Sequence, residues 1–488
     1  MTPTTSPPST RPHRAPSVHH YATLLLTLTL CVPLALPSLT PSLSANARIT
    51  LLVFVLATAA WIATPVDDTY IALGAGLALT VTGVIGSETL FGTLGNETVW
   101  LLICAFVLAA AVTRTGLAGR AAAFLVGGAR SVRQLVHLST AALVVTAFAV
   151  PATSGRAALA LPVFLALAKA LADRRRVVVM LALLFPTVIL LSAVATLIGA
   201  GAHLITVSVL WEATGERIGF TQWLLLGLPL AVVSSHLAAE AVLLLTTRRE
   251  DRRIPAAITP AQIQQHSDRP VTGPLTPSEA RCAALLGTVV LLWCSEPLHQ
   301  VPPAVVALIG AVVAASPALG TVRLKEALTT VPWSLLLFMA ATMAMGVALS
   351  QSGAAHWLMS NLPLAGFPPW AFLTAVVVVS TAAHLMLQSR SARSSVLVPL
   401  VVAAAVTAGV NPVAAALAST AAAGFCHTLP ASAKPVTLFA DIPGTPTYTP
   451  RDLLRLSAVL APLTAATVLL FALVVWPLLG VPVLLPTR

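Results

Sequence analysis

The amino-acid sequence has very little charge. Only 9% of its 488 residues are Asp, Glu, Lys or Arg, whereas 57% are hydrophobic. Soluble domains carry about 25% charged and about 45–50% apolar residues. The composition therefore excludes a cytosolic globular protein, a disordered protein and a protein that binds nucleic acid, although the net charge is +11. We expect a protein whose surroundings are a lipid bilayer.

Motifs for enzyme chemistry and for ATP-driven pumping are missing as well. The chain contains no GxxxxGK[ST] phosphate-binding loop and no HExxH metal motif. Its cysteines stand apart in apolar runs without CxxC spacing, so they predict neither a metal site nor a disulfide framework. These are Cys31, Cys104, Cys282, Cys294 and Cys426. We therefore expect no enzyme, no cofactor and no bound metal.

Long apolar runs make up most of the chain. A transmembrane helix needs about 20 mostly apolar residues, and eleven runs are expected to form such spans. They are 21–38, 49–64, 69–86, 98–112, 177–212, 219–247, 282–298, 303–320, 331–350, 412–440 and 456–480.

Two further apolar stretches are interrupted by arginine near their middle. Residues 134–172 and 366–411 are each about 40 residues long. Each is either two full spans or one re-entrant hairpin whose tip is buried in protein. The expected fold class is an all-α polytopic membrane protein with about 11 transmembrane helices plus two re-entrant hairpins.

The placement of arginine predicts the orientation in the membrane. Cytoplasmic loops are enriched in Lys and Arg, and the basic residues cluster in 113–133, 173–176 and 248–281. We expect a multi-pass protein of the plasma membrane, with a cytoplasmic amino terminus and an extracytoplasmic carboxyl terminus. Both ends of 134–172 are then cytoplasmic, which fits a hairpin.

Composition and charge also suggest boundaries along the chain. Residues 1–20 are rich in Pro, Ser and Thr and are expected to be a disordered cytoplasmic tail, with a cleaved signal peptide before residue 47 as the alternative. The other expected parts are scaffold helices in 21–96, a first repeat in 97–247, a cytoplasmic linker in 248–281, scaffold helices in 282–330 and a second repeat in 331–480.

Two short sequence matches, both at the same offset along the chain, indicate an internal repeat. Residues 154–158 match 391–395, and 115–118 match 352–355, both at an offset of 237. Five spans lie between the two hairpins, and an odd number turns the second copy upside down. Inverted repeats are typical of secondary transporters, whose sites lie at broken helices near the bilayer midplane. Gly and Pro predict such breaks in the helices 177–212 and 412–440.

At these residues the chain resembles the divalent anion:sodium symporter family, a citrate-transporter-like part of the ion transporter superfamily. The resemblance covers roughly 47–480 and rests on short landmarks at 97–100, 114–117, 195–199, 223–229 and 409–412. It implies a homodimer with a scaffold domain and a transport domain that moves like an elevator. It also implies a small anionic substrate, a di- or tricarboxylate, and sodium as the coupling ion.

The sequence departs from this family at the hairpin tips. Family members carry a Ser-Asn-Thr signature there for substrate carboxylates and sodium. Here the triplets read Ala152-Thr153-Ser154 and Ser389-Arg390-Ser391, so neither copy retains the Asn.

Four cations, Arg156, Arg390, Arg393 and Lys434, lie within apolar segments that otherwise carry little charge. On insertion scales an Arg or Lys at a helix centre costs about 2.5–3.5 kcal/mol, so each must be paired, hydrated or facing a cavity. Few acidic residues in the apolar segments are available to pair with these cations, so the middle of the membrane carries a net positive charge, which suits an anion. Hydroxyl groups and free backbone amides at helix starts add hydrogen-bond donors for that anion. The candidate substrate-binding residues are Thr153, Ser154, Gly155, Arg156, His203, Ser389, Arg390, Ser391, Arg393 and Lys434.

Several alternatives remain open at this point. Arg156 and Arg393 either brace their own hairpins, contact the substrate or replace the charge of a sodium ion. His236 and Glu240, four residues apart, fit a plain helix pair or a proton relay. The transport hypotheses are a sodium-independent anion carrier, a proton-coupled carrier or exchanger of an inorganic oxyanion, and an anion channel with hairpin gates.

Overall fold

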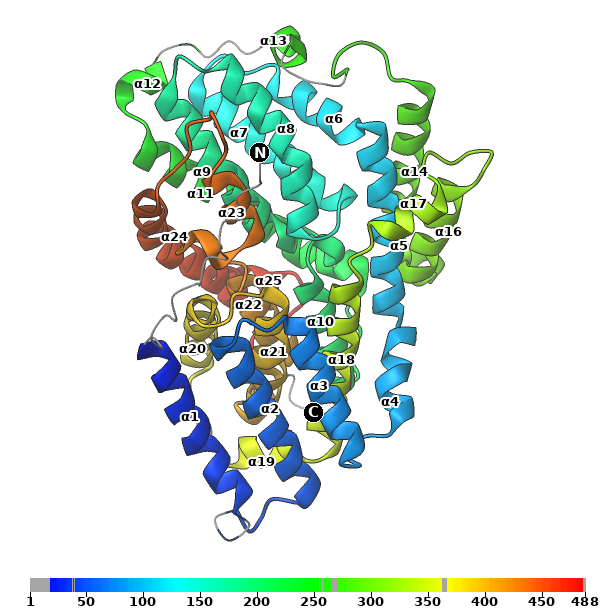
Figure 1. The fold of residues 1–488 in the computed structure, drawn as a ribbon, viewed down its shortest axis with the longest axis vertical. Helices are drawn as coiled ribbons and strands as arrows, with labels where there is room; N and C mark the ends of the chain where they lie inside the picture. Colours follow the sequence, from blue (N-terminus) through cyan, green and yellow to red (C-terminus); the bar gives the residue numbers. More distant parts are fainter. Residues whose placement is uncertain are drawn as a thin grey trace, which may run out of the picture.

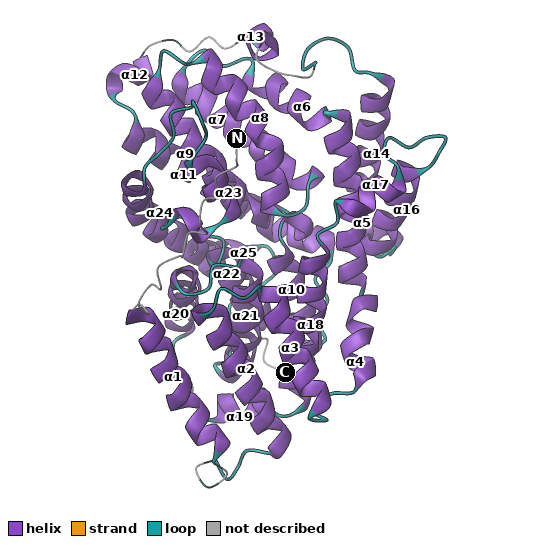
Figure 2. Ribbon diagram, viewed as in Figure 1, coloured by secondary structure: helices purple, strands orange, loops and turns teal. Residues whose placement is uncertain are grey.

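The computed structural model describes residues 18–36, 38, 40–253, 255, 259–265, 270–361 and 367–485. Throughout this part of the chain the regular secondary structure is helical and no β-strand occurs (Figures 1 and 2). The expected all-α class is confirmed. The expected amino-terminal tail lies outside the described residues up to residue 17, as does the choice between a tail and a signal peptide.

The helices fall into two successive groups. Before the linker they are α1 (Val18–Ala35), α2 (Ala45–Ala63), α3 (Asp68–Val81), α4 (Ser87–Gly92), α5 (Glu97–Thr115), α6 (Leu117–Val126), α7 (Val132–Ala149), α8 (Thr153–Ala170), α9 (Arg175–Leu191), α10 (Gly201–Thr214) and α11 (Phe220–Thr246). From the linker onward they are α12 (Arg249–Arg253), α13 (Pro260–Gln265), α14 (Pro277–Cys294), α15 (Glu296–His299), α16 (Pro303–Ala315), α17 (Leu324–Thr329), α18 (Trp333–Gln351), α19 (Ala354–Ser360), α20 (Pro369–Ala382), α21 (Arg390–Thr407), α22 (Pro412–Ala422), α23 (Lys434–Ala440), α24 (Pro450–Leu470) and α25 (Trp476–Leu478).

Nine helical segments of the described chain are long and apolar enough to cross a membrane, by length and composition. Each of the eleven expected runs contains a described helix, in agreement with the polytopic class. However, α3, α16 and α22 have only 14, 13 and 11 residues. The expected spans 177–212 and 412–440 are each divided, because short 3-10 turns separate α9 from α10 and α22 from α23.

Capping residues explain where several helices begin and end. Asn96 accepts a hydrogen bond from Thr98 N at the start of α5, and Gly116, at φ +79°, ends that helix. Thr276 and Glu279 form a capping box at the start of α14. This box starts the helix at Pro277, before the expected start near residue 282.

Two helical hairpins lie where the interrupted stretches were expected. The first joins α7 to α8 through Val150–Ala152, where Ala152 has a left-handed φ of +64°. The second joins α20 to α21 through a 3-10 turn (Ala383–Leu385) and the residues that follow it. We call them hairpin 1 and hairpin 2.

The two halves of the chain share backbone details at matched positions. Gly116 and Gly353, at the offset of 237, both have φ +79°, and α8 and α21 begin at this same offset. Each break consists of a 3-10 turn of three residues followed by an extended alanine. These alanines are Ala200 (φ −157°, ψ +148°) and Ala433 (φ −157°, ψ +144°). The matched backbone supports an internal repeat.

The helices form two bodies around separate apolar cores. One core lies among hairpin 1, α9, the end of α11, α23 and α24, in the upper part of Figure 1. The other joins most remaining helices, including α2, α3, α10, α18, α21 and α22, in the lower part. The Arg-bearing helices α6 and α12 lie at the upper end with α13, and α19 lies at the opposite end.

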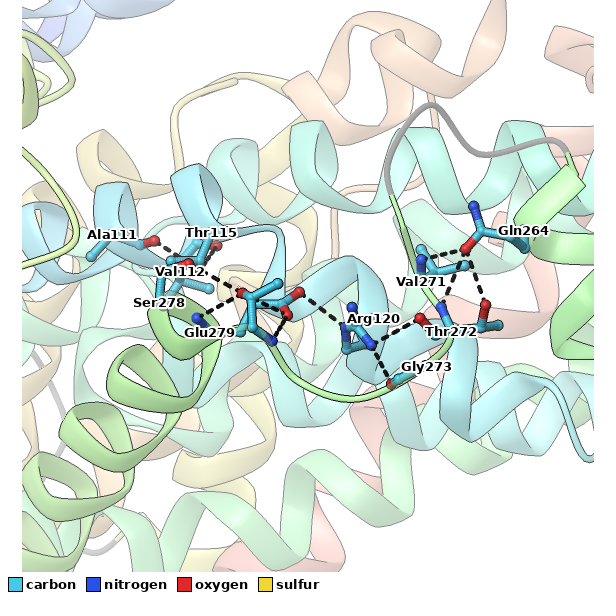
Figure 3. Close-up of polar contacts among 11 residues, drawn as sticks. Ala111, Val112, Thr115, Arg120, Gln264, Val271, Thr272, Gly273, Ser278 and Glu279 are labelled. Atoms are coloured by element: carbon cyan, nitrogen blue, oxygen red, sulfur yellow. Dashed lines mark hydrogen bonds and ion pairs between the residues drawn. The ribbon is translucent and has the colours of Figure 1, made fainter.

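A buried ion pair fastens the described end of the linker to the helix before hairpin 1 (Figure 3). Arg120 on α6 donates from Nε to Glu279 Oε1 at 2.9 Å. Its Nη1 donates to the carbonyls of Thr272 at 3.1 Å and Gly273 at 2.7 Å. Both charged side chains are buried, with 9% and 5% of their surface exposed. The linker segment is therefore attached to α6 and to α14 together.

We expect Glu279→Gln to lower the free energy of unfolding by about 3 kcal/mol, because removing one member of a buried ion pair leaves the Arg120 charge uncompensated. Unfolding of the purified protein by heat or denaturant measures this loss. The matched control is Glu326→Gln, since Glu326 pairs with Arg114 and Arg323 but is 38% exposed. Exposed pairs contribute little, so equal losses in both variants would contradict the fastening role.

Candidate functional site

The two hairpin tips meet at the carboxyl end of α9. The last carbonyls of a helix have no partner within it, and they favour cations. Here Ile189 O accepts from Arg156 Nη1 of hairpin 1 at 3.0 Å. The next carbonyl, Leu190 O, accepts from Arg390 Nη2 of hairpin 2 at 3.2 Å. Both guanidinium groups therefore lie at one helix end, inside the protein.

Arg156 is held by four hydrogen bonds and is fully buried. Besides Ile189 O it donates from Nη2 to Leu143 O at 2.6 Å and to Ser192 Oγ at 2.7 Å, and from Nε to Thr146 Oγ1 at 3.0 Å. All three nitrogens have a partner. Two carbonyls and two hydroxyls thus surround the guanidinium, an arrangement that supports a bracing role and leaves it away from solvent.

Arg393 occupies the matching place in hairpin 2 and is also fully buried. Its Nη1 donates to Phe425 O at 3.4 Å and its Nη2 to Cys426 Sγ at 2.8 Å, whereas Nε has no partner. Phe425 and Cys426 precede the second break. Sequence reasoning treated Cys426 only as a small apolar residue, and its isolated position gave no signal of this contact.

Arg390 is the least satisfied of the three guanidinium groups. Its Nε and Nη1 are shielded from solvent yet have no hydrogen-bond partner. A Cβ added at Gly424 would overlap Arg390 Nη2 and would lie 2.8 Å from Ala421 O, so the Arg390 side chain packs directly against this glycine. His203 Nε2 and His427 Nε2 are likewise buried without a partner, and both rings lie within electrostatic range of Arg390.

Hydroxyl groups and helix starts adjoin these cations. Ser389 caps α21 by accepting from Ala392 N at 3.2 Å. A Cβ at Gly201 would lie 3.3 Å from Ser391 Oγ, so the start of α10 lies against the tip of hairpin 2. In hairpin 1, Ser154 is exposed at the tip. Hydroxyls and free backbone amides at helix starts are donors that suit an anion.

The remaining candidates divide between buried and open positions. Thr153 and Gly155 lie partly exposed in the first turn of α8, and His203 is fully buried, its Nδ1 3.1 Å from Thr196 O and its ring against Trp223. Lys434, the first residue of α23, is exposed. The first break is therefore closed to solvent and the second is open.

An acidic pair near hairpin 2 was not expected from the sequence. The Asp68 carboxyl interacts with the Ser389 side chain, and Lys434 lies within electrostatic range of Asp67 and Asp68. Hydrogen bonds from Thr69 hold the pKa of the Asp67 carboxyl below its ordinary value, so it stays ionised at neutral pH. The sequence placed this pair in a short loop between two spans, with no signal that the loop reaches the tip.

His236 and Glu240 lie elsewhere and are bridged by a residue of hairpin 1. His137 Nε2 is 2.6 Å from Glu240 Oε1, and His137 Nδ1 is 2.8 Å from His236 Nδ1. Arg133 Nε also donates to Glu240 Oε1, at 2.8 Å. The cluster therefore joins α7 to α11, rather than forming a pair within one helix.

Known proteins resemble this chain over most of its length. The model of a family described as citrate transporter matches residues 58–422. A membrane protein of Cupriavidus necator is 27% identical over 402 residues, which cover 79% of this chain and 75% of that protein. The sodium-dependent dicarboxylate transporter SdcS of Staphylococcus saprophyticus is 22% identical over 418 residues, with 78% and 79% covered.

Two solved structures share the fold. The YdaH transporter of Alcanivorax borkumensis aligns with a TM-score of 0.53 and 18% identity over 90% of this chain and 99% of that chain. MtrF of Neisseria gonorrhoeae, described among antimetabolite efflux pumps, aligns with a TM-score of 0.57 and 13% identity over 91% and 98%. At these identities the likeness shows the fold alone.

We expect Arg156→Met to destabilise the protein more than Arg390→Met. The first change removes four hydrogen bonds from a charged donor, and each such bond contributes about 1.5–3 kcal/mol. The second removes one hydrogen bond. Melting temperatures of the two purified variants provide the measurement. A larger loss for Arg390→Met would argue that Arg156 does not brace its hairpin.

Proposed function

Because the chain belongs to the citrate transporter family and is thus a membrane transporter, we propose that it is a secondary active carrier of a di- or tricarboxylate. The proposal includes an elevator-like movement of the hairpins and their neighbouring helices against a scaffold. Its substrate is a small organic anion that enters at the meeting point of the two hairpin tips.

The observation that carries this proposal is buried positive charge without a carboxylate. Among the described residues, Arg156, Arg390 and Arg393 form no ion pair with Asp or Glu. Burying an uncompensated charge is costly. Arg156 spreads its charge over polar groups, but Arg390 keeps two unpaired nitrogens. A carboxylate of the substrate would supply the missing partner.

Lys434 and the hydroxyls fit the same substrate. Lys434 is exposed at the open break, and Ser154 is exposed at the other tip, so both are accessible to an entering anion. We assign Arg390 the first carboxylate, with Ser391 beside it, and Lys434 the attraction of a second. Arg156 and Arg393 serve by holding the tips.

We further propose that transport does not require sodium. Unwound carbonyls and hydroxyls at broken helices are the ligands that carriers use for sodium. In this chain the Arg156 guanidinium already occupies two carbonyls and two hydroxyls. A fixed cation in this position supplies the charge that a travelling sodium ion would bring, unlike in relatives named as sodium-dependent.

A second candidate is coupling to protons. It is favoured by the cluster in which His137 of hairpin 1 lies 2.8 Å from His236 and 2.6 Å from Glu240, both on α11. Uptake driven by an imposed pH gradient, and its loss in His137→Gln, would distinguish this candidate from exchange or uniport.

The proposal also covers the cellular location and the assembly of the protein. We propose the plasma membrane, with the end that holds α6, α12 and α13 in the cytoplasm because it gathers arginine (Figure 1). The amino terminus is then cytoplasmic and the carboxyl terminus extracytoplasmic. A homodimer remains the expected assembly.

We expect Arg390→Met to abolish uptake of radiolabelled succinate and citrate into proteoliposomes while the melting temperature stays near that of the wild type, because the variant loses the unpaired donors but only one hydrogen bond. Lys325→Met, on the exposed face of α17, is the control and should transport normally. Undiminished uptake by Arg390→Met would remove this residue from the substrate site.

Sodium independence predicts equal uptake by the wild type in sodium and in choline buffers. Arg156→Ala empties the cage, that is, the two carbonyls and two hydroxyls that surround the Arg156 guanidinium. We expect transport by this variant to fall at least about tenfold. It should recover when guanidinium or sodium is added, since either cation can occupy the vacated carbonyls. Strict sodium dependence of the wild type would refute the proposal. Failure of both ions to rescue a folded Arg156→Ala would refute the role of the cage.

A further inference from the structure

A large apolar cavity lies away from the hairpin tips. Its volume is about 730 Å³, and it is bounded by α1, α2, α20 and α21, which lie in the lower part of Figure 1. Among its walls are Leu34, Phe54, Ile62, Val376, Val379 and Leu400. Both arms of hairpin 2 therefore contribute to one side of the cavity, and the first two helices contribute to the other.

The walls select an apolar occupant. An apolar cavity of about 150 Å³ stays dry and takes up benzene or xenon, and this cavity is several times larger. It offers no cation within its apolar walls, so it does not suit the transported anion. Its size and its position between apolar helices suit a hydrocarbon chain.

One end of the cavity lies at the loop between α1 and α2. Thr40 lines it and is 6% exposed, and its Oγ1 has no hydrogen-bond partner. Beside it, Arg48 donates from Nη2 to Thr40 O and Leu43 O, both at 3.2 Å, while its buried Nε has no partner. A hydroxyl in the wall of an apolar cavity, with a guanidinium bonded to the same residue, matches the ester and phosphate of a phospholipid.

A tryptophan marks the same end as the membrane interface. Trp357 of α19 lines the cavity, and its Nε1 donates to Ser42 Oγ at 3.0 Å. Tryptophan is enriched at the level of lipid headgroups, where its ring is apolar and its N–H is hydrated or bonded. The cavity therefore extends from this interface toward the bilayer interior, in the direction of an acyl chain.

We propose that this cavity binds a phospholipid of the surrounding bilayer, with an acyl chain between α1–α2 and hairpin 2 and the headgroup at Thr40 and Arg48. The tail of this chain is not a suitable occupant, because residues 1–17 contain only Met1 and Ala15 as apolar residues besides proline. The bound chain fills space next to hairpin 2, and the proposal is independent of which solute is transported.

The test uses adjacent valines on α20 that are equally exposed. Val379 lines the cavity and is 55% exposed, whereas Val378 is 54% exposed and lies outside its walls. The full chain is placed in nanodiscs of palmitoyl-oleoyl phosphatidylglycerol or, separately, of palmitoyl-oleoyl phosphatidylcholine. After release from the nanodiscs, the lipid that each variant retains is counted by native mass spectrometry. We expect Val379→Trp to retain at least about tenfold less lipid than Val378→Trp, because indole fills the acyl site.

Thr40→Val keeps the shape of the side chain and removes only its hydroxyl, so it tests the Thr40 end of the cavity even if the tryptophan variant fails to fold. We expect it to weaken phosphatidylglycerol retention about fivefold, the loss of one hydrogen bond of about 1 kcal/mol. Equal lipid retention by the wild type, Val379→Trp and Thr40→Val would overturn the proposal. So would a change from dimer to monomer in Val379→Trp without loss of lipid, because the cavity would then be a contact between two copies.

Discussion

The carbonyl groups at the end of α9 are the constraint on which the rest of this structure depends. A helix that ends inside a membrane protein has no water for its last acceptors. Here Ile189 O and Leu190 O accept from Arg156 and Arg390, one from each hairpin. The same bonds satisfy a helix end, accommodate two buried cations and bring two tips together from stretches more than 200 residues apart.

The three arginines differ in how many of their guanidinium nitrogens have a hydrogen-bond partner. Arg156 is enclosed on all of its nitrogens, Arg393 on two of three, and Arg390 on one. A guanidinium with a full set of partners behaves as part of the framework, whereas one with unpaired donors stays ready for a ligand. In the proposed function, this difference in partners assigns bracing to Arg156 and substrate binding to Arg390.

Much of the fold could be predicted because apolar length and arginine position report directly on the membrane. Helices occupy the expected apolar runs, and α8 and α21 begin at the expected offset of 237, whereas the assignment of re-entrant hairpins in an inverted repeat stays a prediction. The contacts of the site could not be predicted in the same way. Asp68 reaches Ser389, and His137 bridges His236 to Glu240, through packing between distant helices that leaves no mark on local sequence. The partners of Arg156 needed the three-dimensional position of α9.

The two breaks share one backbone but differ in what they expose, and this difference has a consequence for alternating conformations. The first break is buried, with Arg156 bonded to Ser192 at its start, and the second exposes Lys434. If the two halves exchanged these conformations, as pseudo-symmetric carriers do, the Lys434 ammonium would lose water at a cost of about 2.5–3.5 kcal/mol. An anion bound beside it would add to the attraction of Asp67 and Asp68 and offset that cost, so the loaded protein would move more readily than the empty one. Movement between the two conformations would then depend on whether a substrate anion is bound beside Lys434.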